Sequence, residues 1–244
     1  FFTLLIIIIS TVGIETNKFN NFVSKKINQT NNKINLELNT IKFKLDVKEI
    51  SLFLETIDPQ INYRNTAIPA KTIRVYINFV SLIKSEPKIK KIYLILQQLD
   101  TQQLKKISVT LKPSNFKSFL NNKINEGKIN TELSIYFDNN NLMQNFIARG
   151  SVSDLKTEIT SNINLKKTNF NFIVDKDDVL LKNILSEAGP IKIKNGDLKL
   201  KLSPEIFLET NFETSLKYNS KSTIHKNFIK NYKYAEYLSQ LNTK

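Results

Sequence analysis

Residues 34–54 read INLELNTIKFKLDVKEISLFL, and apolar side chains occupy nearly every second position of this stretch. Successive side chains of a β-strand point to opposite faces, so a period of two predicts strands with one apolar and one polar face. The alternation changes phase after Asn39-Thr40. We expect a bulge or tight turn there, because an unbroken strand would send the two apolar sets to opposite faces.

The same alternation recurs through most of the chain, in runs that begin near Ile73, Ile92, Ile129, Phe170 and Ile191. Turn-forming residues separate several of these runs, namely Asn139-Asn140-Asn141, Lys176-Asp177-Asp178 and Asn195-Gly196. One-sided strands joined by short turns are typical of antiparallel sheets. The sequence therefore predicts a mostly β fold with roughly a dozen antiparallel strands.

Two short helices interrupt the strands. Asp100, with Gln103 three residues later, predicts an N-cap and a capping box for a helix over 101–108. Pro113 starts a second helical pattern over 114–124, which we expect Gly127 to close. These helices are too short to cover more than a few strands each, so most of the apolar strand faces need another cover.

Two arrangements would supply that cover, and the pattern alone favours neither. The sheet closes on itself around a sealed core, as in a β-sandwich, or it twists and curls strongly into an elongated apolar groove around a guest such as a lipid acyl chain. The candidate groove-lining residues are the apolar members of the strand runs: Ile34, Leu36, Leu38, Ile50, Leu52, Leu54, Ile73, Val75, Ile77, Ile92, Leu94, Leu96, Leu133, Ile135, Phe170, Phe172, Leu198, Leu200, Leu208 and Phe212.

The first fourteen residues, FFTLLIIIISTVGI, contain no charge, and the chain does not begin with Met. This stretch is shorter than the approximately 20 residues that span a bilayer, so we expect 1–14 to be a truncated transmembrane anchor. A signal peptide stays open as the other reading of this segment. The anchor residues would be Leu4, Leu5, Ile6, Ile7, Ile8 and Ile9.

Helical spacing returns on both sides of the predicted sheet. Phe19, Phe22, Val23 and Ile27 predict a juxtamembrane amphipathic helix over 15–27. A β-groove domain would then cover 28–218. Apolar residues at helical spacing after 218 predict a helical segment over 219–244 that leads into a further part of the protein.

Composition argues against several classes of function. The formal net charge is +14, but the lysines are spread along the strands and arginine is scarce, so nucleic acid is not an expected partner. The chain has no cysteine and one histidine, and it contains no serine-hydrolase, zinc-protease or phosphate-loop motif. We therefore expect no enzyme activity, no catalytic residue, no metal and no cofactor.

Several stretches together resemble the AsmA-like proteins of Gram-negative bacteria, the relatives of AsmA, TamB and YhdP. The resemblance covers most of 1–218 and lies in six stretches: IETNKFNNFVSKKI (14–27), INLELNTIKFKL (34–45), ISLFLE (50–55), IRVYINFVSLIK with IKKIYLILQQLDTQQLKKI (73–107), FIARGSV (146–152) and GDLKLKLSP (196–204).

This resemblance implies a single-pass inner-membrane protein with most of its chain in the periplasm. It implies a twisted β-groove that carries phospholipid toward the outer membrane, and no catalytic residues. The expected partners are phospholipid acyl chains, the inner membrane and other envelope or outer-membrane proteins. The alternative is an exported β-sandwich with a sealed core that binds protein or glycan.

Overall fold

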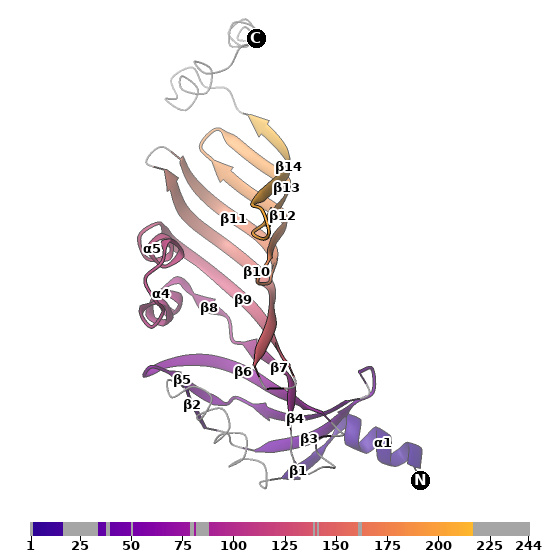
Figure 1. The fold of residues 1–244 in the computed structure, drawn as a ribbon. Helices are drawn as coiled ribbons and strands as arrows, with labels where there is room; N and C mark the ends of the chain where they lie inside the picture. The colour runs from indigo at the N-terminus through magenta and orange to yellow at the C-terminus, as the bar shows by residue number, and fades with distance from the viewer. Residues whose placement is uncertain are drawn as a thin grey trace, which may run out of the picture.

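A computed structural model describes residues 2–16, 34–37, 40–49, 51–78, 81, 88–138, 140, 142–160 and 163–216. In these residues fourteen strands form a single sheet, every strand pair is antiparallel, and a few helices lie beside it (Figure 1). The prediction of a mostly β, antiparallel fold with few helices is confirmed.

The N-terminal part contains a helix followed by short strands and one long strand: α1 (Phe2–Thr11), β1 (Ile14–Thr16), β2 (Ile34–Glu37), β3 (Ile41–Asp46), β4 (Ser51–Ile57), β5 (Gln60–Tyr63) and β6 (Thr66–Ile77). The remaining elements are β7 (Ile89–Leu96), β8 (Leu99–Asp100), α4 (Thr101–Val109), α5 (Asn115–Asn122), β9 (Ile124–Phe137), β10 (Met143–Thr160), β11 (Ile163–Val174), β12 (Asp178–Ala188), β13 (Ile191–Lys201) and β14 (Phe207–Leu216).

The main path through the sheet is β1-β3-β4-β6-β7-β9, and it continues from β10 to β14 in chain order. The sheet is twisted but not strongly curled, which corrects the predicted wrapping around a guest (Figure 1). Eleven of the described strands follow one continuous path, and of the others only the small β2–β5 ladder, which shares β6 with that path, packs over its apolar face. Separate elements cover parts of the apolar face: β2 and β5 pack at one end, and α4 and α5 pack in the middle.

The N-terminal end holds a closed core. Strand β2 pairs with β5, and β5 pairs with the start of β6, so this small ladder places Leu36 against the main sheet. The buried members are at most 6% exposed: Leu36, Ile41, Leu54, Ile73, Val75 and Ile77. Strand β6 contributes to both ladders because its first residues pair with β5 and its later ones with β4 and β7.

The phase change after Asn39-Thr40 marks a change of partner strand. Strand β2 ends at Glu37 and pairs with β5, whereas β3 begins at Ile41 and pairs with β1 and β4. The predicted break in the alternation is therefore present. It brings the apolar side chains of two ladders together in one core rather than bending a single strand.

A row of β-bulges crosses the C-terminal strands. Asp154 in β10, Lys167 in β11 and Asn183 in β12 have positive φ values of 53°, 49° and 55°, and each lies at or beside a register shift or a gap in strand pairing. Two extra backbone N–H groups are satisfied from a neighbouring strand. The N–H of Asp154 donates to Oδ1 of Asn169 at 3.0 Å, and that of Asn183 donates to Oδ1 of Asp197 at 3.1 Å. Bulges of this kind increase the local twist.

The expected hairpin turn at Asn195-Gly196 is wrong. Strand β13 continues through both residues, and a register shift against β14 lies just before Asn195. Gly196 lies opposite Phe212, and a Cβ at this glycine would overlap the Phe212 ring. The glycine thus gives an aromatic side chain room to lie flat on the strand, rather than providing a turn.

The predicted turn at Lys176-Asp177-Asp178 and both helices are present, whereas Asn139 and Asn141 of the other predicted turn lie outside the described residues. Asp175 Oδ1 accepts from the N–H groups of Asp177 and Asp178 at 2.8 Å each in the turn between β11 and β12. Helix α5 does not end at Gly127: it ends at Asn122, and Lys123 caps it in a helical conformation. The chain then enters β9 directly, so Gly127 belongs to a strand.

The N-terminal segment differs in part from its prediction. Helix α1 covers ten residues, and Leu4 and Ile7 are exposed on it. Residues Ile14–Thr16 pair with β3, so the sheet begins before residue 28 and the start of the expected helix over 15–27 is a strand. None of the helices in the described ranges has the length and apolar content to cross a bilayer. Residues 17–27 and 219–244 lie outside the described part of the chain.

Candidate functional site

The two middle helices have well-formed N-termini. Asp100 caps α4 through a capping box: its Oδ1 accepts from the N–H of Gln103 at 2.8 Å, and the Gln103 side chain accepts from the N–H of Asp100 at 2.9 Å. Ser114 caps α5 by accepting from the N–H of Lys117 at 3.1 Å. Both caps satisfy backbone donors that a short helix would otherwise leave unpaired.

Side-chain hydrogen bonds hold this helix pair in place. The Thr101 hydroxyl donates to the carbonyl of Gly127 in β9 at 3.2 Å, which fixes the start of α4. Arg64, in the turn between β5 and β6, donates to the Thr110 carbonyl at 2.6 Å and fixes its end. Between the helices, the buried Ser108 hydroxyl lies 3.0 Å from Oδ1 of Asn121. Helix α4 is therefore held at both of its ends, by β9 and by the β5–β6 turn, and α5 is joined to it.

A cavity of about 390 Å³ lies between the helix pair and the sheet. We call it the helix-covered cavity. Its walls come from α4, α5, the 110–114 connection and strands β9 to β12, and most of the lining side chains are apolar: Leu104, Ile107, Leu111, Phe116, Phe119, Leu120, Ile124, Ile129, Val152, Leu155, Phe170, Phe172, Val174 and Leu181, with Thr101, Ser108, Gly127 and Lys128.

The two hydroxyl groups of the cavity wall already have partners. The Thr101 hydroxyl is bonded to Gly127, and the Ser108 hydroxyl donates to the Lys105 carbonyl at 2.7 Å. A ligand in the cavity therefore meets apolar surface almost everywhere. The wall is also open to solvent at the α5 side, where Phe116 is 65% exposed.

Phe172 forms part of the cavity floor by lying across a glycine. It pairs with Gly150 of β10, and a Cβ at position 150 would meet the tip of the Phe172 ring at 2.9 Å. On its other side Phe172 pairs with Leu181 of β12. Because the Phe172 ring lies flat against the sheet, it leaves space above it that a side chain projecting away from the sheet would fill.

The predicted groove residues fall into three places. Phe170 and Phe172 line the helix-covered cavity. Leu36, Leu54, Ile73, Val75 and Ile77 lie in the closed N-terminal core, and Ile92 and Leu94 pack against it. The remaining described ones lie on strands beyond these two clusters: Leu52, Leu96, Leu133, Ile135, Leu198, Leu200, Leu208 and Phe212.

Cross-strand pairing places these clusters on one continuous face. Ile73 pairs with Leu94, Leu94 with Leu133, and Leu133 with Ala148. The same row continues from Ala148 through Val174, Val179 and Leu200 to Leu208. Leu38 and Ile50 lie outside the described residues, and only the backbone of Ile34 and of Leu5 is described.

Of the residues that line the cavity, the sequence prediction named only Phe170 and Phe172 as lining residues. The α4 and α5 residues that cover the cavity follow a helical spacing and were expected only to cover a few strands. The signal that could have identified them is the pair of caps at Asp100 and Ser114, because these fix two amphipathic helices directly before β9. No strand pattern shows where such a helix pair lies on a sheet.

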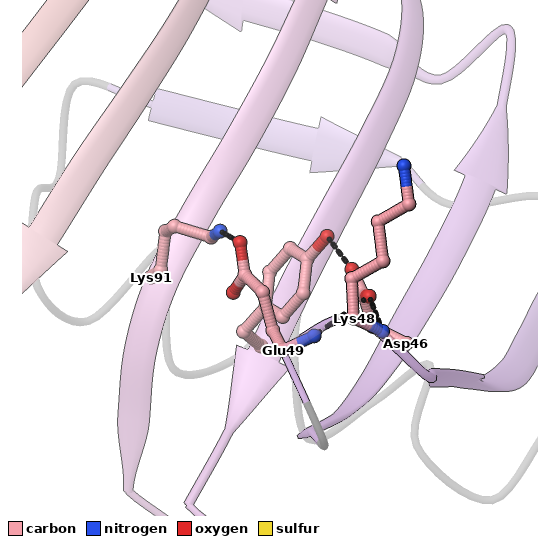
Figure 2. Close-up of polar contacts among 5 residues, drawn as sticks. Asp46, Lys48, Glu49 and Lys91 are labelled. Carbon is pink, nitrogen blue, oxygen red and sulfur yellow. Dashed lines mark hydrogen bonds and ion pairs between the residues drawn. The ribbon is translucent and has the colours of Figure 1, made fainter.

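The opposite, polar face carries a separate set of ion pairs near β3, β4 and β6. Figure 2 shows Lys91 bonded to Glu49, with 2.6 Å between Nζ and Oε1, beside Asp46. The Tyr76 hydroxyl donates to Oδ2 of Asp46 at 3.1 Å, and the Lys91 ammonium lies 4.1 Å from the Tyr76 ring centre. Burial and the charge of Asp46 raise the pKa of Tyr76 to about 12.

Asp46 stays ionised in this network. Burial acts to raise its pKa, but hydrogen bonds from the N–H groups of Glu49 and Lys48 and from the Tyr76 hydroxyl outweigh burial and lower the pKa. Glu49 and Lys91 pair with each other, and Asp46 accepts hydrogen bonds from Tyr76 and from two backbone N–H groups. The network has the features of a structural cluster that holds the β3–β4 turn against the sheet.

A shallow hollow of about 650 Å³ also lies on the polar face, over β7, β9, β10 and β11. Amide and hydroxyl side chains line it together with the apolar Ile95, Leu96 and Ile173, and the described residues supply no hydrogen-bond partner to the side chains of Gln97, Gln98, Asn130, Ser151 and Asn171. Arg149 and Lys71 add positive charge, and Glu132 adds negative charge. The described residues hold no group of three or more His, Asp or Glu side chains that could bind a metal ion.

Comparisons of the chain with protein-family models, with curated proteins and with solved structures find no match. Function is therefore inferred from the geometry of the described residues.

Proposed function

We propose that this protein binds lipid acyl chains in the helix-covered cavity. The observation that carries the proposal is a preformed cavity of about 390 Å³ whose walls are apolar on both the helix side and the sheet side. Ligand sites in proteins commonly have volumes of about 300–1,000 Å³. Each methylene group that moves from water into such a site contributes about 0.8 kcal/mol, so a hydrocarbon chain needs no polar contact for binding.

Two further observations support an acyl chain over a compact apolar ligand. The cavity is open on the side of Phe116, so a polar headgroup can stay in water. The apolar face also continues beyond the cavity, from Leu181 to Leu198 and from Val179 to Leu200 and Leu208. A chain longer than the cavity therefore has further apolar surface to lie on.

In the cell, we propose the role that the resemblance to AsmA-like proteins implies. The protein would be held at the inner membrane by its N-terminal segment, with the sheet in the periplasm. There it would take part in phospholipid transport toward the outer membrane, together with other envelope proteins. Neither catalysis nor a cofactor is part of this proposal.

The test measures lipid on the full-length chain. The purified protein is extracted with organic solvent for mass spectrometry, and a fluorescent long-chain fatty acid is titrated into it. We expect co-purified lipid and saturable binding. Val152→Phe places a ring inside the cavity and should weaken fatty-acid binding about tenfold, the effect of losing roughly two buried methylene contacts.

Val47→Phe is the matched control, because Val47 is 57% exposed in the turn after β3 and does not line the cavity. It should bind like the wild type. A lipid-free chain that binds no fatty acid contradicts the proposal, and so does an equal effect of the two substitutions. A thermal melt of each variant separates lost binding from lost folding.

The polar-face hollow favours a second candidate function, the binding of a glycan or another hydroxyl-rich ligand. Its amide side chains lie on neighbouring strands: Asn130 pairs with Ser151, and Ser151 pairs with Asn171. Unpartnered amides are suited to sugar hydroxyls. Binding of an oligosaccharide that Asn171→Ala abolishes, with no lipid on the purified chain, would favour this candidate over the first.

A further inference from the structure

The segment that forms the helix pair has an unusual charge. Residues 101–123 contain five lysines and no aspartate or glutamate. Lys105, Lys106 and Lys112 have no ion-pair partner among the described residues. Lys117 donates to the carbonyls of Val109 and Leu111 at 3.0 Å each. The positive charge of this segment is therefore not neutralised within the described part of the molecule, except where Lys123 meets Glu158.

The same segment exposes large apolar side chains. Val109 is 71% exposed and Phe116 is 65% exposed, and both lie close to the connection between the helices. Leu111, in the connection itself, and Phe119 are exposed as well. Apolar side chains in water cost free energy unless something covers them, and a cluster of this kind beside lysines is a feature of interaction surfaces.

The combination of exposed apolar side chains and lysines favours a lipid bilayer as the partner. Helices with exposed Phe and Leu side chains and with lysines around them lie in the interface of a bilayer, where the apolar groups enter the acyl region and the lysines meet anionic headgroups. A nucleic acid would attract the lysines but would not need the aliphatic Val109 and Leu111. Rigid attachment of the pair through Thr101 and Arg64 holds the exposed groups in one place.

We propose that the α4–α5 pair is a docking surface for an anionic lipid bilayer. Val109, Leu111 and Phe116 enter the interface, and Lys105, Lys106 and Lys112 contact the headgroups. Phe116 also lines the helix-covered cavity, so docking brings the cavity opening to the bilayer surface. The docking surface stands without the proposed function, because it rests on exposed side chains and charge and not on a lipid inside the cavity.

The experiment uses the absence of tryptophan from the chain. Val109→Trp in the full-length protein introduces a single tryptophan, which can be excited apart from the tyrosines, at an exposed site that does not line the cavity. With vesicles that contain phosphatidylglycerol, its emission should shift to shorter wavelength, and lipids with brominated acyl chains should quench it. With pure phosphatidylcholine vesicles neither change should occur.

Ile206→Trp is the control reporter, since Ile206 is 80% exposed and lies in the β13–β14 connection. Its emission should stay unchanged with both kinds of vesicle. Attachment through α1 alone would leave both reporters in water. A membrane contact of the α4–α5 pair is therefore distinguished from other membrane contacts of the chain.

Lysine variants test the charge. In the Val109→Trp protein, Lys105→Gln, Lys106→Gln and Lys112→Gln together should raise the half-saturating lipid concentration roughly 100-fold, since each lysine near an anionic surface is worth about a factor of five. Lys194→Gln, Lys199→Gln and Lys201→Gln in β13 remove the same net charge and should have a much smaller effect.

Three results would overturn the proposal: no spectral change of the Val109→Trp protein with anionic vesicles, an equal change of the Ile206→Trp protein, or equal effects of the two triple lysine substitutions. Fatty-acid binding by Val152→Phe is measured separately. Vesicle docking without fatty-acid binding would contradict the proposed function and leave the docking surface in place. Fatty-acid binding without vesicle docking would contradict the docking surface and leave the proposed function in place.

Discussion

At the scale of single residues, Glu55 is the most constrained charge among the described residues. Its side chain is 6% exposed, and it pairs with Lys44 and with Arg74, whose Nε lies 2.8 Å from Oε1. The Arg74 guanidinium also lies over the rings of Phe53 and Tyr93. Burial acts to raise the pKa of Glu55, but the two cations outweigh burial, and the pKa is lowered.

This lowered pKa makes stability depend on pH. A carboxyl group whose folded pKa lies below its ordinary value of 4.5 stabilises the fold above pH 4.5, and the stabilisation is lost as pH falls through the folded value. Glu55→Gln should lower the free energy of unfolding by about 2 kcal/mol at pH 7. The difference in the free energy of unfolding between Glu55→Gln and the wild type should decrease below pH 4.5. Urea unfolding over a pH series measures this difference.

Glu126→Gln is the comparison for this prediction. Glu126 also pairs with a lysine, Lys156, but its side chain is 63% exposed. Exposed ion pairs contribute little, so this variant should lose less than about 0.5 kcal/mol. Equal losses in the two variants, or a Glu55→Gln gap that stays constant as pH falls, would contradict the assigned role of Glu55.

At the scale of strands, two glycines lie under phenylalanine rings, but their surroundings differ. A Cβ at Gly150 would overlap the backbone carbonyl oxygen of Asn130, which the β9–β10 ladder holds in place. A Cβ at Gly196 would overlap only the ring of Phe212, a side chain on an exposed strand. The first clash requires the strands to move, and the second requires a ring to turn.

Alanine substitutions test this difference. Gly150→Ala should cost about 3 kcal/mol of unfolding free energy, and Gly196→Ala about 1 kcal/mol. Phe212→Ala in the same chain should remove most of the cost of Gly196→Ala, whereas Phe172→Ala should not remove the cost of Gly150→Ala. Double-mutant cycles by urea unfolding measure both couplings. A coupling energy near zero between positions 196 and 212 would refute the contact.

The elements themselves were largely predictable, because alternation and capping are local signals. The alternation of Ile73, Val75 and Ile77 identifies a strand, and Asp100 with Gln103 identifies the start of α4. The predictions that failed concern features that depend on a partner strand. Asn195-Gly196 is a common turn pair, yet here the glycine belongs to a strand because Phe212 lies across it. That neighbour is far along the chain, so no local pattern contains it.

At the scale of the molecule, the burial of side chains decreases along the sheet from its N-terminal to its C-terminal strands. Strands β4 and β6 form most of the closed core, whereas the described side chains of β14 are nearly all exposed. The sequence does not show this gradient, since Leu54 and Leu208 have similar surroundings in the chain. The predicted groove lining therefore separates into a sealed end, a covered cavity and an open face.

Hydrogen exchange should follow this gradient. Backbone amides in β4 and β6 should exchange most slowly, because their opening requires the core to unfold, and those in β14 should exchange fastest among the strands. Mass spectrometry of fragments over a time course measures the exchange in each strand. If a fatty acid binds as proposed, added fatty acid should slow exchange in α4, α5 and β9–β12 and leave β4 unchanged. Equal protection of β6 and β14 would contradict the gradient.

The order of the last strands has a consequence for how the protein forms. From β9 to β14 every strand pairs with the strand that precedes it in the chain. Each new strand therefore finds its partner edge already in place as the chain emerges from a ribosome or a translocation channel, and closes only a short loop. The sheet can be completed one strand at a time from its N-terminal core, so synthesis and folding proceed in the same direction.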